Sequence, residues 1–195
     1  MRINKVIKYL ILFDFATLTG AGLIIPIFAI FITSNIIGGT AAVAGFASTI
    51  FMASFSIARL SSAYIVDKRL SDKKKVAFSI FGTVLIGISY ILYVLARLPW
   101  HVYLLQTMNG IGTGFRYAPF MSLFTRHIDK GQESFEWGMA AVSTSIGQAL
   151  TGAIGGVLVE LYGFNLVFTL AGAFIVLSSF IPLTIYSNIN SRPVR

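Results

Sequence analysis

Long apolar runs without charge dominate this chain, and they constrain its fold more than any other feature. The segment 12–31 (LFDFATLTGAGLIIPIFAIF) contains one ionisable residue, Asp14. Only 11% of the 195 residues are charged, whereas a typical soluble domain has about 25%. Apolar runs of about 20 residues are typical of membrane-spanning helices. The sequence therefore predicts an all-α integral membrane protein.

Six such runs are present, and each can cross a hydrocarbon core of ~30 Å at about 1.5 Å per residue. We predict membrane spans at about 9–32, 41–66, 76–96, 100–124, 137–160 and 164–187. Together they form one transmembrane domain, 1–195, which we expect in a bacterial or archaeal plasma membrane.

The positive charges predict how this domain is oriented. The two termini and the loops near 67–75 and 125–136 hold twelve of the 15 Lys and Arg residues, and the short loops between the other span ends hold only Arg97. Because Lys and Arg accumulate in cytoplasmic loops, we expect both termini and both charged loops in the cytoplasm.

The composition argues against several classes of function. The chain has no Cys and only two His residues, so we expect no metal site and no cofactor. The net charge of +8 is explained by topology, and no basic helix interleaved with aromatic residues indicates nucleic-acid binding. Neither a nucleophile motif nor a phosphate-binding loop is present, so we expect no enzymatic activity.

A weak internal repeat relates the two halves of the chain. A shift of 93 residues places Pro26 on Pro119 and Asp67 on Glu160. The same shift also aligns the glycine pairs Gly38 with Gly131 and Gly45 with Gly138. We therefore predict two three-helix repeats, about 1–96 and 97–195. Since three is odd, the copies would be inverted in the membrane, which is typical of transporters.

Four segments resemble the major facilitator drug and tetracycline exporters. They are GLIIPIFAIF (22–31), AYIVDKRLSDKKKV (63–76), QTMNGIGTG (106–114) and GQALTGAIGG (147–156). The second segment is similar to the conserved cytoplasmic loop of that superfamily, and Asp67 and Lys68 fit it. The resemblance implies that Asp67 and Lys68 belong to a loop that latches one conformation against the opposite half of a transporter.

The resemblance also implies a fold and a function. The family normally has twelve helices, and this chain supplies the first six, which form one half-bundle. We expect a secondary transporter for a small molecule that pairs with a second six-helix bundle, and proton-coupled export is one form that this transport could take. That bundle would be a second copy of the chain or a separate half. The alternative is a truncated or non-transporting membrane subunit or scaffold.

Three ionisable residues fall inside the predicted spans at similar depth. Asp14, Arg59 and Arg116 lie about 10, 8 and 6 Å to the cytoplasmic side of their span midpoints at 1.5 Å per residue. Each is costly if it faces lipid, so each should face the interior or water. We predict that Asp14 pairs with Arg116 at the inner mouth of a polar cavity, with Arg59 nearby. Arg59 could instead reach the cytoplasmic surface, because its side chain is long.

Other polar and small residues are candidates for the cavity and for helix packing. Gln106, Asn109, Gln148 and Tyr117 are candidate cavity residues. The fifth span carries small residues at helical spacing, which lets helix backbones approach closely. These packing candidates are Gly147, Thr151, Gly152, Gly155 and Gly156. The sequence leaves open whether this face packs within the bundle or against a second one.

Overall fold

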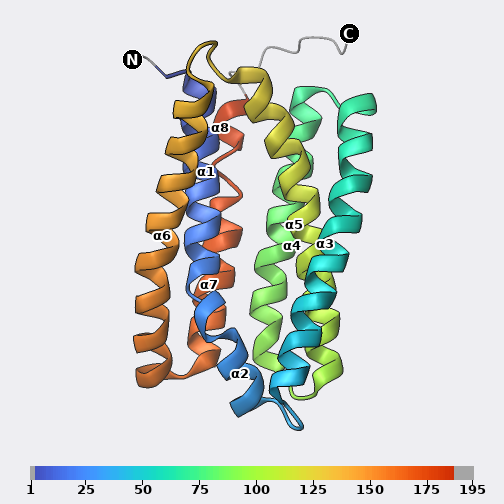
Figure 1. Cartoon of the computed structure of the whole chain (residues 1–195), viewed down its shortest axis with the longest axis vertical. Helices are drawn as coiled ribbons and strands as arrows, with labels where there is room; N and C mark the ends of the chain where they lie inside the picture. The colour runs from blue at the N-terminus through green and yellow to red at the C-terminus, as the bar shows by residue number, and fades with distance from the viewer. Residues whose placement is uncertain (1–2, 187–195) are drawn as a thin grey trace.

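The computed structural model describes residues 3–186, and every regular element in this range is helical (Figure 1). In chain order these elements are α1 (Lys5–Gly22), η1 (Ile25–Ile27), α2 (Phe28–Asn35), α3 (Ala41–Arg69), α4 (Asp72–Leu92), η2 (Tyr93–Leu95), α5 (Pro99–His127), α6 (Glu133–Tyr162), α7 (Phe164–Ser178) and α8 (Leu183–Tyr186). The prediction of an all-α membrane protein is confirmed. Residue 187 of the predicted sixth span and the C-terminal tail lie outside the described residues.

Five of the six predicted spans are long and apolar enough to cross a membrane by length and composition. The remaining one is the fourth predicted span, which forms α5. This helix is 29 residues long but is not among the five. Its polar side chains explain the difference, since Gln106, Asn109 and Arg116 all lie on this helix and are all buried. A helix that packs against neighbours on several sides can carry polar groups that a lipid-facing helix cannot.

Several helices begin before their apolar runs. The helix α4 begins at Asp72 and α6 begins at Glu133, each four residues before its predicted span. Both helices have acidic residues in the first turn, where the partial positive charge of the helix N-terminus stabilises a carboxylate. The first turns therefore extend beyond the apolar part of each span.

The first span is not one continuous helix. Its regular helix α1 ends at Gly22, and Pro26 lies in the short turn η1 before α2 begins. Proline lacks the amide hydrogen that continues an α-helix, and its ring clashes with the preceding turn. By contrast, Pro119 lies inside α5, which remains one assigned helix.

The helices pack in an order that interleaves the two halves of the chain (Figure 1). The helix α1 packs mainly on α6 and α7, whereas α5 packs mainly on α3 and α4. Contacts between α4 and α7 join these two groups. Each group therefore combines helices from both halves of the sequence.

Two apolar clusters hold the bundle together at its two ends. One cluster surrounds Phe31, Tyr93 and Phe168, whose rings lie 4.7 Å (Phe31–Phe168) and 5.0 Å (Tyr93–Phe168) apart. The other includes Phe124, whose ring lies 4.1 Å from that of Trp137. Aromatic pairs at these separations stabilise a core beyond the burial of their surface.

The two charged loops lie at the same end of the bundle as the start of α1 (Figure 1). At this end Arg126 Nη1 lies 2.8 Å from Asp72 Oδ1, and Lys75 Nζ lies 3.6 Å from the same oxygen. Lys75 Nζ also donates a hydrogen bond of 2.8 Å to Ser122 Oγ. These contacts tie the beginning of α4 to the end of α5.

Glycine allows α4 and α5 to approach closely. A Cβ atom placed on Gly82 would lie 2.6 Å from the Gly112 carbonyl oxygen, and one on Gly112 would lie 2.9 Å from the Gly82 carbonyl oxygen. Any side chain at either position would force the two backbones apart. Close backbone approach through small residues is a main source of helix association in membranes.

We expect Gly82→Ala to lower the stability of the bundle by about 1–3 kcal/mol, because the added methyl overpacks this contact. Gly45→Ala is the matched control, since a Cβ at Gly45 has no atom within 4 Å. Alanine is the better helix former, so the control should leave the bundle equally or more stable. Thermal unfolding of both variants in detergent measures the difference. Equal midpoints for the two variants would contradict the close packing of α4 on α5.

Candidate functional site

A buried ion pair joins α1 to α5. Arg116 Nη2 donates to Asp14 Oδ1, and the two side chains are 3% and 13% exposed. The Arg116 guanidinium also lies 5.0 Å from the centre of the Phe13 ring and 5.7 Å from that of Phe120. An unpaired charge at this depth would be costly, so each group compensates the other.

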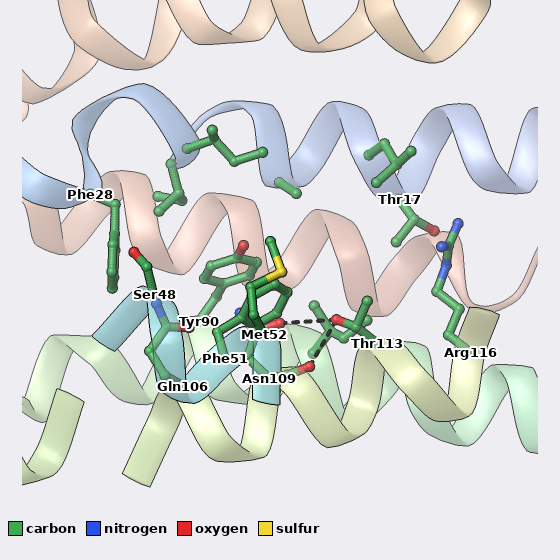
Figure 2. A pocket seen from close by; sticks show the side chains of 15 residues that line it. Thr17, Phe28, Ser48, Phe51, Met52, Tyr90, Gln106, Asn109, Thr113 and Arg116 are labelled. Atoms are coloured by element: carbon green, nitrogen blue, oxygen red, sulfur yellow. Dashed lines mark hydrogen bonds between the residues drawn. The ribbon is translucent and has the colours of Figure 1, made fainter. Parts of the chain in front are cut away.

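Arg116 of this pair lies at one end of a cavity of about 380 Å³ that residues of four membrane-spanning segments line (Figure 2). Fifteen residues line it: Thr17, Leu18, Ala21, Ile24, Ile25, Phe28, Ser48, Phe51, Met52, Ile86, Tyr90, Gln106, Asn109, Thr113 and Arg116. Most of these side chains are apolar or aromatic. The volume lies within the range of about 300–1,000 Å³ that is typical of small-molecule pockets.

The polar groups of the cavity come mainly from α5. Thr113 Oγ1 donates to the Asn109 carbonyl oxygen at 2.8 Å and lies 3.3 Å from Asn109 Oδ1 (Figure 2). Gln106 is 8% exposed, and its side chain has no hydrogen-bond partner within residues 3–186. On the facing helix, the Thr17 hydroxyl bonds to the Phe13 carbonyl oxygen at 2.9 Å and to Ser178 Oγ at 3.0 Å.

The cavity has a buried floor and an open rim. Gln106, Asn109 and Arg116 on the floor are all less than a tenth exposed. Ile25 and Met52 on the rim are 58% and 59% exposed. The opening therefore lies between the first and second membrane-spanning segments.

Two of the four residues that the sequence proposed for the cavity line it, namely Gln106 and Asn109. Tyr117 points elsewhere, since its ring meets Phe55 edge-on at 6.1 Å and lies under the Arg59 guanidinium at 4.3 Å. Gln148 lies against the end of α1, where its backbone meets Gly22. Neither Tyr117 nor Gln148 lines the cavity.

Arg59 stays outside the Asp14–Arg116 pair. It is exposed and lines a second cavity of about 550 Å³ at the charged-loop end, together with Asp67, Lys75 and Arg126. Asp67 is exposed and makes no ion pair within the described part of the chain. Lys68 Nζ lies 3.4 Å from the hydroxyl of Tyr64.

The small residues of α6 divide into two sets. Side chains added at Gly147 and Gly155 would collide with α1, and Thr151 Oγ1 donates to the Thr19 carbonyl oxygen at 2.8 Å. A Cβ atom on Gly152 would lie 3.3 Å from the Pro26 ring, whereas one on Gly156 has no atom within 4 Å. Gly147, Thr151, Gly152 and Gly155 therefore pack within the bundle, whereas Gly156 leaves room on the helix surface.

The sequence analysis missed most of the cavity wall. Phe28, Phe51 and Tyr90 line the cavity, but aromatic residues inside apolar spans carry no signal that distinguishes cavity from core. Thr113 could have been found, because it lies four residues after Asn109 and three before Arg116. These residues share one face of an α-helix.

The comparisons with known proteins agree with this fold. The sequence model of the Major Facilitator Superfamily matches residues 10–194. The chain belongs to the Major Facilitator Superfamily. Among solved structures, it is similar to the POT family transporter PepTSo, with a TM-score of 0.84 and 13% identity. The match covers 100% of this chain and 40% of that one. No curated protein matches the chain.

Proposed function

We propose that this major facilitator chain forms one six-helix half of a secondary transporter that moves a small molecule across the membrane. The observation that carries the proposal is the cavity, which has Arg116, paired with the Asp14 carboxylate, at one end and an open rim at Ile25 and Met52. Intramembrane ionisable residues beside a cavity are typical of substrate and ion pathways.

A second bundle completes the transport path in this proposal. Alternating access requires two bundles that rock around a central site. The exposed rim at Ile25 and Met52 supports a partner surface on that side, and the chain spans 40% of the length of the transporter it resembles. The second bundle is another copy of this chain or a separate half.

The two halves of the chain are inverted repeats in this account. The interleaved packing supports this, because the first span of each half packs on the second and third spans of the other half. The aligned glycines Gly38 and Gly131 also share a left-handed backbone, with φ of +76° and +80°. Both follow the first span of their repeat, where a turn with positive φ favours glycine.

Asp14 is the proposed coupling group of an exporter that a proton gradient drives. When Asp14 takes up a proton, Arg116 loses its only ion-pair partner within residues 3–186. Asp67 and Lys68 supply the proposed latch at the charged-loop end. The exposed carboxylate of Asp67 makes no ion pair within residues 3–186, which leaves it available to the second bundle. Protonation at the pair would thereby favour one of two arrangements of the bundles.

We expect the charged-loop end to face the cytoplasm. The chain has no Cys, so single-cysteine labelling needs no prior substitution. In intact cells a membrane-impermeant maleimide should label Arg97→Cys and leave Lys130→Cys unlabelled. Both residues are exposed, and the loops that hold them, between α4 and α5 and between α5 and α6, lie at opposite ends of the bundle (Figure 1). Both should react after lysis. Labelling of Lys130→Cys alone in intact cells would show that the charged-loop end faces the outside.

We expect Asp14→Asn to abolish accumulation driven by a proton gradient while downhill exchange continues, because the amide cannot take up a proton. Proteoliposomes with an imposed pH gradient and a defined mixture of small molecules test this, with luminal contents measured by mass spectrometry. Glu160→Gln is the control, since this exposed acid lies at the far end of α6. Full gradient-driven accumulation by Asp14→Asn would exclude the coupling role.

A further inference from the structure

We propose that the cavity takes an uncharged aromatic molecule with an amide-like hydrogen-bonding edge, and that Gln106 recognises this edge. The inference rests on the proposed function and names the class of substrate. Three features of the cavity carry it: its aromatic walls, the amide of Gln106, which has no hydrogen-bond partner within residues 3–186, and the neutralised charge of Arg116.

Aromatic side chains from three different segments form the walls. Phe28 of α2, Phe51 of α3 and Tyr90 of α4 all line the same cavity (Figure 2). The flexible thioether of Met52 lines the rim and can adapt to different shapes. Flat aromatic rings between such walls gain contact area and favourable edge-to-face geometry.

Gln106 is the polar group that is available to a ligand. Its side chain is 8% exposed, lines the cavity and has no hydrogen-bond partner within the described residues. An amide carries both donors and an acceptor, so a ligand that supplies an acceptor and a donor can engage both of its polar atoms. Asn109, by comparison, is already engaged by Thr113.

The charges around the cavity disfavour ionic ligands. Arg116 is the only charged residue of the lining, and its guanidinium is paired with Asp14. An anion would have to compete with Asp14 for Arg116, and no carboxylate in the lining is available to a cation. An ion would therefore lose its hydration without gaining a counter-charge.

Three naphthalene probes of matched shape test the inference. They are uncharged 2-naphthamide, anionic 2-naphthoate and cationic 2-naphthylmethylammonium. Calorimetric titration of the chain in nanodiscs, with empty nanodiscs as the blank for partitioning, measures the three affinities. We expect 2-naphthamide to bind at least about tenfold more tightly than either ion.

Variants separate the roles of the two polar features. Gln106→Leu should weaken 2-naphthamide about tenfold and leave the hydrocarbon 2-ethylnaphthalene unchanged. Gln148→Leu is the matched control and should change neither affinity, since Gln148 does not line the cavity. Asp14→Asn should strengthen 2-naphthoate about tenfold by freeing Arg116, whereas Glu160→Gln should not.

The outcomes distinguish this inference from the proposed function. Tightest binding by either ion, or no binding by any probe, would overturn the substrate class. Equal effects of Gln106→Leu and Gln148→Leu would overturn the role of Gln106. Either result would leave gradient-driven transport standing, because that assay uses a mixture of small molecules and does not depend on these probes. If the wild-type chain showed no accumulation driven by the pH gradient, that result would count against the proposed function alone.

Discussion

The ion pair between Asp14 and Arg116 is the interaction on which the rest of the structure depends. It spans the seam between two groups of helices, α1 with α6 and α7 on one side and α3 with α4 and α5 on the other. Elsewhere the groups meet mainly through apolar contacts between α4 and α7. In a membrane interior neither charge is stable alone. The pair therefore determines how α1 and α5 face each other, and with them the cavity that lies between their segments.

Close packing and the cavity are two results of one arrangement. Glycine brings α4 against α5 and α6 against α1, so the backbones of these helix pairs approach closely at those positions. The aromatic-walled cavity lies where α1, α3, α4 and α5 meet, beside the interruption of the first span at η1, and the second cavity lies at the charged-loop end. The rim at Ile25 adjoins this interruption, because Pro26 ends the regular hydrogen bonding of α1. A bundle with closely packed helix pairs and an open cavity rim is suited to rigid-body motion against a second bundle.

Hydropathy was sufficient to predict the helices but not their rotation. Apolar runs located every span, yet α4 and α6 begin earlier because Asp72 and Glu133 are favourable in a first helical turn. Asp14 and Arg116 are predicted to lie at similar depth, and a charge at that depth needs a partner. The structure brings the two side chains together. Depth could not show that Tyr117 turns away from the cavity, because the packing of α3 on α5 determines that rotation. The charge run near 67–75 also concealed a specific contact, in which Asp72 binds Arg126.

A double-variant cycle on the pair tests this account most directly. Asp14→Leu and Arg116→Met each leave one buried charge unpaired, so each should lower the free energy of unfolding by about 3–5 kcal/mol. The double variant buries no charge and should lie within about 1 kcal/mol of the wild type. Denaturant unfolding in mixed micelles measures all four proteins. Additive losses, with the double variant the least stable of the four, would show that the two side chains do not pair.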